Sequence, residues 1–272
     1  MRYLVLFIFL LIGLSRITVA AVNEKIVPNQ QSSYLMIDLD SGETIDGRDA
    51  DKPRPIASLT KLMTALVAKD NTSPHDILTV PSLVEGIEPT IMGLSAGEKL
   101  TIEELLYGLL LPSGNDAAET LAYNLGGRDA FVARMNDKAE TLGMTQTHFR
   151  TPTGFDVPGQ YSSARDLATL TQTILKEDPL IEKVIGTYRY QRLATTDHKT
   201  FRLTNGNIFL DPQRPNKQWT ILAGKIGNTP EAGGCIVVEG QIREKKVLLV
   251  LLGSQDRESE TVELFNRAAT KI

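Results

Sequence analysis

Strand-forming segments lie near both ends of the chain, and this placement constrains the fold more than any other sequence feature. Near the start, residues 33–39 predict a strand, and a turn leads from it into a second strand around 43–47. Near the end, residues 234–239 and the apolar run 247–252 predict two further strands. Strands that enclose a different middle region favour an antiparallel sheet with a lobe inserted into it.

The middle of the chain has helical rather than strand character. Helices are predicted at 58–69, 102–111, 115–125, 128–142 and 164–176, and a last helix at 261–272. Ser163, followed by Asp166, predicts an N-cap for the helix that begins at 164. The expected fold class is therefore α+β, with an antiparallel sheet formed by the N- and C-terminal strands and an inserted helical lobe.

The first residues have the layout of a secretory signal peptide. Arg2 precedes an apolar run of eleven residues at 4–14, and small residues surround Ala20. Because a membrane-spanning helix needs about 20 apolar residues, we expect cleavage after Ala20 rather than a stable membrane anchor. The expected organisation is a signal peptide at 1–20 and one domain at 21–272.

Composition excludes several classes of protein. The net charge of −4 becomes about −6 without the two arginines of residues 1–20, which argues against nucleic acid as a partner. Cys235 is the only cysteine, so no disulfide can form within the chain. The histidines are His75, His148 and His198, and no spacing of His or Cys resembles a zinc site, so no metal and no cofactor is expected.

Ser58 and Lys61 form the only S-x-x-K motif of the sequence. Residues three apart share one face of a helix, so the Lys61 amine would lie within reach of the Ser58 hydroxyl. A serine hydroxyl becomes a good nucleophile only when a neighbouring base takes its proton. By itself the motif also fits an N-cap serine followed by a solvated lysine.

Two further motifs follow in the chain. Ser113-Gly114-Asn115 stands where one predicted helix ends and the next begins, and it offers a hydroxyl and an amide from one tight loop. Lys225-Ile226-Gly227 lies just before the predicted strand at 234–239. Taken singly, the first motif fits a cap and turn, and Lys225 fits a solvated charge.

In chain order, these motifs resemble the S-x-x-K, S-x-N and K-[ST]-G set of the penicillin-recognising serine enzymes. Within that superfamily the chain resembles the low-molecular-weight penicillin-binding proteins of the D-alanyl-D-alanine carboxypeptidase type, over essentially its whole length after the signal. Segments 54–61, 143–149 and 159–166 share the resemblance. It implies a β-lactamase/DD-peptidase-like fold, a catalytic domain at 21–272, location in the periplasm or cell-wall space, and inhibition by β-lactams.

The resemblance also implies the chemistry of the matched residues. Ser58 would attack the D-Ala carbonyl of a peptidoglycan stem peptide ending in D-Ala-D-Ala and form an acyl-enzyme. Lys61, held neutral by nearby positive charge, would be the base, and Ser113 would pass the proton to the leaving amine.

Four other positions are implied to bind the substrate. Asn115 would hold the substrate backbone, and Lys225 would lower the Lys61 pKa and attract the substrate carboxylate. Gly227 completes the third motif and Asn228 directly follows it, and the backbone amides of Ser58 and Asn228 would form the oxyanion hole.

Ile226 departs from the family pattern, which has Thr or Ser at this position. Without that hydroxyl, a substrate carboxylate loses about 1.5–3 kcal/mol of charge-assisted hydrogen bonding. Asn228 or Thr229 could supply another donor. One alternative is therefore a D,D-endopeptidase that cuts D-Ala cross-links in peptidoglycan, and a second is a catalytically impaired homologue that only binds peptidoglycan.

Two other hydrolase classes fit less well. A β-lactamase of this layout needs a glutamate in an E-x-x-L-N motif, which is missing; the segments at Glu103-Glu104 and at Glu119 come nearest. Slow turnover of β-lactams is therefore expected. A Ser-His-Asp hydrolase fits less well, because only three histidines are available to act as the base.

Overall fold

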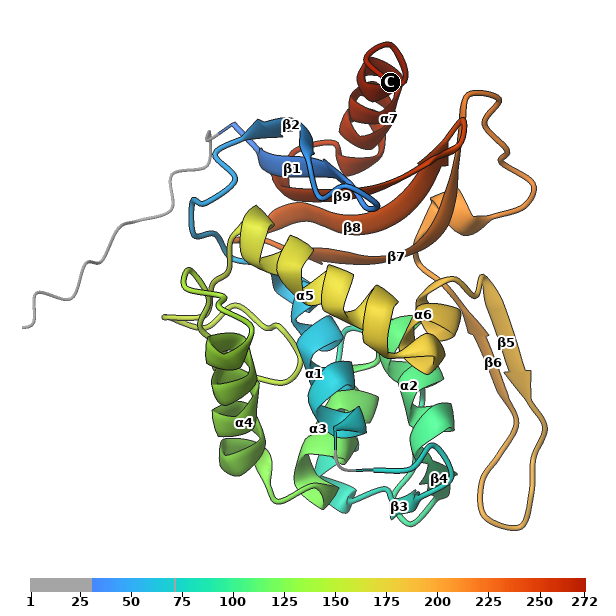
Figure 1. The fold of residues 1–272 in the computed structure, drawn as a ribbon. Coiled ribbons are helices and arrows are strands. Elements are labelled where there is room, and N and C mark those ends of the chain that lie inside the picture. Colours follow the sequence, from blue (N-terminus) through green and yellow to red (C-terminus); the bar gives the residue numbers. More distant parts are fainter. Residues whose placement is uncertain (1–30, 71) are drawn as a thin grey trace, which may run out of the picture.

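The computed structural model describes residues 31–70 and 72–272, so the predicted signal peptide lies outside the described residues. Its main sheet has five strands: β1 (Ser33–Asp38), β2 (Thr44–Arg48), β7 (Trp219–Thr229), β8 (Gly233–Ile242) and β9 (Lys245–Ser254). They lie in the order β2-β1-β9-β8-β7, and every neighbouring pair is antiparallel (Figure 1). Strands from both ends of the chain thus share one sheet, which confirms the predicted α+β class.

The edge strand β7 was not predicted from the sequence. It pairs with β8 over its whole length, and Lys225 lies opposite Val237. A register shift between Ile221 and Ala223 interrupts the alternation of apolar and polar residues in β7. The strand then continues with Gly224, the buried Lys225 and Gly227, which are not typical of a strand. The third motif consequently lies on a strand rather than before one, because pairing with β8 outweighs the weak local strand signal.

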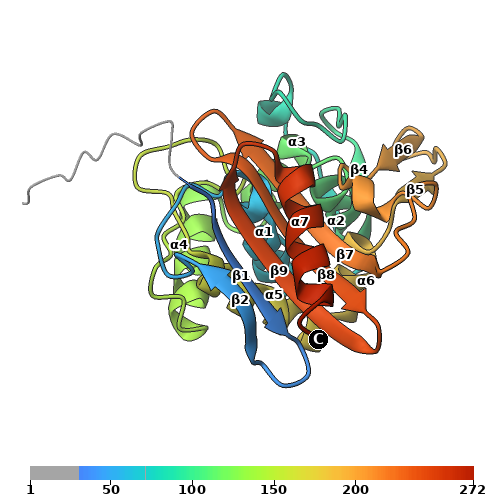
Figure 2. The ribbon, with the colours of Figure 1, turned by 90° about the horizontal axis from the view of Figure 1, so that it is seen from above.

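The two faces of the sheet are covered by different elements. Helix α7 (Arg257–Ala269) packs on one face, where Phe265 joins Met36, Val238 and Leu249 in a buried cluster. Helix α5 (Ala164–Glu177) and the helical lobe cover the other face, where Val237 and Val250 are buried (Figures 1 and 2). This alternation of side chains follows from the two-residue period of a strand.

The remaining elements of the helical lobe are inserted between β2 and β7. Its other helices are α1 (Thr60–Lys69), α2 (Ile102–Leu110), α3 (Asn115–Asn124), α4 (Arg128–Thr141) and α6 (Pro179–Ile185). Two small hairpins join β3 (Ile77–Thr79) to β4 (Lys99–Thr101) and β5 (Arg189–Arg192) to β6 (Phe201–Thr204). The five predicted internal helices are confirmed, whereas α6 and both hairpins were missed because three to seven residues show too little periodicity.

Three helix starts show how side chains set the boundaries. Ser163 accepts a hydrogen bond from the Asp166 amide at 3.1 Å, which confirms the predicted N-cap of α5. Helix α7 begins at 257 rather than 261, because Asp256 caps it by accepting from the Ser259 amide at 3.0 Å. The predicted helix at 58–69 begins as a 3-10 turn, Ala57–Leu59, before α1 starts.

In the described part of the chain, no helix is long and apolar enough to cross a membrane.

Candidate active site

The three motifs meet where the helical lobe adjoins the edge of the sheet. Ser58 lies in the 3-10 turn at the start of α1, Ser113 and Asn115 lie at the start of α3, and Lys225 lies on β7. Strand β7 and the 3-10 turn pack against each other: a Cβ added to Gly227 would stand 2.9 Å from the Ser58 amide nitrogen. Only glycine permits so close an approach of strand and turn.

Lys61 has no exposed surface, and its amine contacts three oxygen atoms. The Nζ atom lies 3.0 Å from Ser58 Oγ, 2.8 Å from Asn115 Oδ1 and 2.6 Å from the Thr153 carbonyl oxygen. Burial lowers the pKa of Lys61 well below its usual value, and the nearby positive charge of Lys225 lowers it further. The sequence-based expectation named only the second of these two causes.

Lys225 forms a similar contact with the second motif. Its Nζ donates to Ser113 Oγ at 2.9 Å and to the Ile226 carbonyl oxygen at 2.7 Å. Burial, together with the positive charge of Arg257, lowers the pKa of Lys225 to about 7. Ser113 has a φ of 65°, in the left-handed region that non-glycine residues seldom adopt. The two hydroxyls of the first two motifs therefore each adjoin a buried amine.

Asp116 and Arg257 were missed from the sequence although both support the site. Asp116 is buried and accepts hydrogen bonds from the amides of residues 92–94 at 2.8–2.9 Å, which fixes that loop beside α3. Arg257 donates from Nη1 to the Gly227 carbonyl oxygen at 3.2 Å. An aspartate directly after Asn115 and an arginine near the start of a helix were the available signals, and neither is specific.

The residues near the missing hydroxyl are arranged less favourably than the sequence suggested. The Ile226 side chain is partly buried and packs against the cluster on the α7 face. The Thr229 hydroxyl donates to Asp156 Oδ1 at 2.6 Å, so its proton is already in use. Asn228 is exposed at the end of β7. Of the two substitute donors considered, only the Asn228 side chain remains available.

The glutamates nearest to a β-lactamase motif are engaged elsewhere. Glu104 belongs to the capping box of α2 with Thr101, and its Oε1 accepts from Arg192 at 2.6 Å. Glu119 pairs with Arg128 at 3.2 Å. Neither carboxylate has a hydrogen bond to Ser58 or Lys61 among the described residues.

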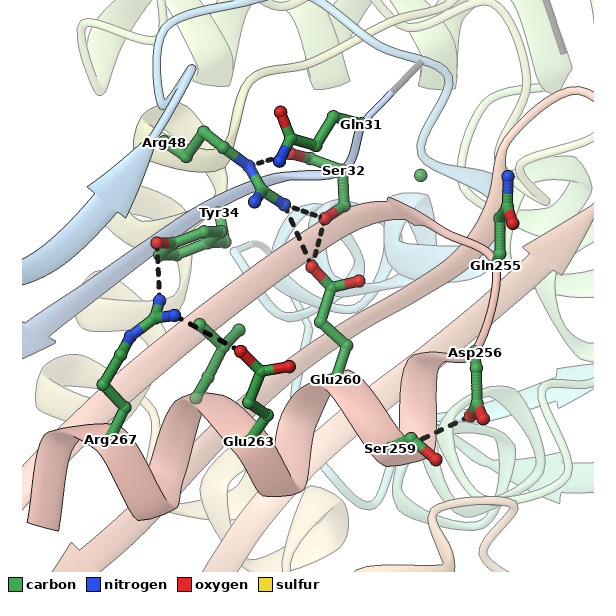
Figure 3. Close-up of a pocket in the computed structure, with 12 residues that line it drawn as sticks. Gln31, Ser32, Tyr34, Arg48, Gln255, Asp256, Ser259, Glu260, Glu263 and Arg267 are labelled. Carbon is green, nitrogen blue, oxygen red and sulfur yellow. Dashed lines mark hydrogen bonds and ion pairs between the residues drawn. The ribbon is translucent and has the colours of Figure 1, made fainter. Parts of the chain in front are cut away.

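A separate polar pocket of about 560 Å³ lies on the α7 side of the sheet, and none of the motif residues lines it (Figure 3). Its charged groups pair with one another: Arg48 with Glu260 at 3.0 Å and Arg267 with Glu263 at 3.5 Å. Over residues 31–70 and 72–272, no three His, Cys, Asp or Glu side chains are grouped closely enough to hold a metal ion. The motif residues, rather than the residues of this pocket, therefore form the candidate active site.

The chain is similar to several proteins of known class. A family model described as D-alanyl-D-alanine carboxypeptidase matches residues 20–256. The D-alanyl-D-alanine carboxypeptidase DacB2 of Mycobacterium tuberculosis is 44% identical over 51% of this chain and 48% of its own length. A D-alanyl-D-alanine endopeptidase of Pseudomonas aeruginosa is 35% identical over 81% of this chain and 70% of its own.

A solved structure shares the fold as well. The crystal structure of the Streptomyces K15 DD-transpeptidase superposes with a TM-score of 0.79 at 27% identity, over 88% of this chain and 96% of that one. The chain spans only about half the length of the first curated relative and 61–62% of the length of two further carboxypeptidases.

Proposed function

The chain belongs to the D-alanyl-D-alanine carboxypeptidase family of serine peptidases, and on this premise we propose that it removes the terminal D-Ala from peptidoglycan stem peptides through an acyl-enzyme on Ser58. The observation that carries the proposal is the set of three oxygen atoms around the Lys61 amine. We further propose export to the periplasm or cell-wall space, which rests on the signal-like sequence of residues 1–20.

The contacts of Lys61 are compatible with a neutral amine that acts as a base. A neutral amine has two N–H groups and one lone pair. Asn115 Oδ1 and the Thr153 carbonyl can only accept hydrogen bonds, so they take both N–H groups. The remaining neighbour, Ser58 Oγ, carries a proton that it can donate to the lone pair at 3.0 Å. Burial of Lys61 lowers its pKa, which favours the neutral form that this arrangement requires.

The reaction then uses the two hydroxyls of the site, one beside Lys61 and one beside Lys225. Ser58 Oγ bonds to the carbonyl carbon of the penultimate D-Ala while its proton moves to Lys61 Nζ. Collapse of the tetrahedral intermediate breaks the peptide bond; Ser113 gives its hydroxyl proton to the leaving amine, and the proton that Lys61 took up replaces it. The backbone amides of Ser58 and Asn228 stabilise the negative oxygen of the intermediate. Water hydrolyses the resulting ester and regenerates Ser58.

At a pH below its pKa of about 7, Lys225 contributes charge rather than a base. Its contacts with Ser113 Oγ and the Ile226 carbonyl use two of the three N–H groups of a protonated amine, which leaves one for a substrate carboxylate. A β-lactam that mimics D-Ala-D-Ala would acylate Ser58 in the same way. Because the nearest glutamates are paired elsewhere, we expect that ester to hydrolyse slowly and the protein to be inhibited.

One observation favours a second candidate function, cleavage of D-Ala cross-links within peptidoglycan. Ile226 has no hydroxyl for a free carboxylate, and the Thr229 hydroxyl donates to Asp156. Weaker binding of the terminal carboxylate lowers the preference for cleavage at a chain end over cleavage of an internal peptide bond. The endopeptidase relative, at 35% identity, is consistent with this alternative.

Two measurements test the proposed function. First, a fluorescent penicillin should label the wild-type protein but not Ser58→Ala, with Ser82→Ala as a matched control that removes a hydroxyl away from the site. Second, the release of D-Ala from a pentapeptide ending in D-Ala-D-Ala should be compared with cleavage of cross-linked muropeptide dimers. Faster cleavage of the dimers would favour the endopeptidase. Absence of labelling together with absence of both activities would identify a peptidoglycan-binding homologue without turnover.

A further inference from the structure

The loop at residues 151–160 touches both segments that hold the proposed oxyanion donors, and the mechanism above uses only one of its atoms. That atom is the Thr153 carbonyl oxygen, which accepts from Lys61. The next residue, Gly154, lies so close to the nucleophile's turn that an added Cβ would stand 2.1 Å from the Ala57 carbonyl oxygen. The 151–160 loop therefore lies directly against the residue before Ser58.

Asp156 joins the same loop to the other oxyanion segment. Its Oδ1 accepts the Thr229 hydroxyl proton at 2.6 Å, and its Oδ2 accepts from the Glu231 amide at 3.2 Å. Thr229 Oγ1 in turn accepts from the Ala232 amide at 3.1 Å. These bonds fix the turn between β7 and β8 immediately after Asn228, whose amide is the second proposed donor.

The loop has its own internal support, so Asp156 is held by the loop and not only by the turn it contacts. Gln160 Oε1 accepts from the amides of Arg150 and Thr151 at 3.0 and 2.9 Å. The Gly154 amide donates to Thr151 Oγ1 at 3.0 Å. Gln160 and Thr151 are both buried. A carboxylate that its own loop holds in place can fix the position of the segment that donates to it.

We propose that Asp156 is a positioning residue for the oxyanion hole: through Thr229, it sets the place of the Asn228 amide relative to the Ser58 amide. The inference rests on the proposed function. Two donors stabilise one negative oxygen only when both lie about 2.7–3.1 Å from the place where that oxygen forms. Asp156 itself contacts neither substrate nor the reacting atoms, and its effect is transmitted along two covalently linked residues, Thr229 and Asn228.

Substitutions at both ends of the hydrogen bond test the proposal. Asp156→Ala and Thr229→Val should each lower kcat for the pentapeptide by about 10- to 100-fold, because small displacements of catalytic groups have effects of this size. The KM should change less than twofold. The double variant should be no slower than the slower single variant, and Thr229→Ser, which keeps the hydroxyl, should restore most of the wild-type kcat.

The rates must be expressed per active site, counted by stoichiometric penicillin labelling, so that partial unfolding does not count as a loss of kcat. Asp76→Ala is a matched control, because Asp76 likewise accepts from a turn amide, that of Ser73 at 2.7 Å, but lies in the helical lobe. It should leave kcat unchanged. Additive losses in the double variant, or a higher KM at unchanged kcat, would overturn the proposal.

An NMR measurement separates failure of this inference from failure of the proposed function. Asp156→Ala should shift or broaden the amide resonance of Asn228 and leave that of Ser58 unchanged. This result does not depend on any activity. If the wild-type protein neither reacts with penicillin nor cleaves peptides, the proposed function is wrong, while an unaltered Asn228 resonance in Asp156→Ala shows that the positioning role is wrong.

Discussion

The two sides of the candidate site each bury a lysine, and the two lysines have different surroundings. Lys61, on the helical side, contacts two oxygen atoms that can only accept and one hydroxyl that can also donate. Lys225, on the sheet side, contacts one hydroxyl and one carbonyl oxygen. Burial lowers the pKa of both, that of Lys225 to about 7 and that of Lys61 well below its usual value.

The difference shows how one site can hold a base and a cation of the same residue type. The charge on Lys225 is a cause of the low pKa of Lys61, so a proton on the sheet side keeps the helical side neutral. The acceptor of the Ser58 proton and the donor to a carboxylate are thereby assigned to different sides of the site. Three substitutions and one pH series test this division.

Removal of the base should have the largest effect. Lys61→Met should lower the rate of acylation of Ser58 by about 10³-fold or more, since a positioned general base contributes roughly 10²–10⁴-fold. The measurement is the time course of labelling by fluorescent penicillin. Lys69→Met, at the other end of α1, is the control, and wild-type labelling of Lys61→Met would show that another group is the base.

Removal of the cation should have a smaller effect of a different kind. Lys225→Met should lower kcat/KM for the pentapeptide by about 10²-fold, the loss typical of one electrostatic donor. The acidic limb of its pH profile should move to higher pH, because without the Lys225 charge the pKa of Lys61 rises. The exposed Lys217→Met is the control. An acidic limb that stays in place would contradict the coupling between the two lysines.

The buried amines should also make the folded protein more stable at alkaline pH. The folded pKa of Lys225, about 7, is below its ordinary value of 10.5. Between these values the unfolded chain binds more protons than the folded one, so stability rises with pH, by at most about 1.4 kcal/mol per pH unit for one group. Urea unfolding from pH 7 to 10 should show a smaller rise for Lys225→Met than for the wild type. Equal slopes would mean that Lys225 remains charged when folded.

The sequence predicted the residues on both sides of the site but not how the two sides are joined. The first two motifs are recognisable because each is local: Ser58 and Lys61 are three positions apart, and Ser113 and Asn115 are two positions apart. Lys225 was matched only as part of an ordered set, since its strand β7 lacks apolar alternation and depends on pairing with β8.

Contacts between distant residues could not be predicted at all. Asp156 and Thr229 are 73 positions apart, and nothing in either local sequence indicates that they meet. The contact between Lys61 and the Thr153 carbonyl oxygen was equally unpredictable, because every residue type has a backbone carbonyl that can accept a hydrogen bond. The fold class was predictable because periodicity along the chain determines helices and strands, whereas the site also depends on where loops of the helical lobe meet the end of the sheet.

The smallest expected effect concerns the sheet side alone and is a gain. Ile226→Thr should raise kcat/KM for the pentapeptide by about tenfold, the lower end of what a charge-assisted hydrogen bond to a carboxylate provides. Cleavage of cross-linked dimers, which is measured in parallel, should change less, because their scissile bond is internal. Ile226→Val is the matched control, since it shortens the side chain without adding a hydroxyl. An equal gain for Ile226→Val would assign the effect to space rather than to hydrogen bonding, and no gain for Ile226→Thr would mean that Asn228 already binds the carboxylate.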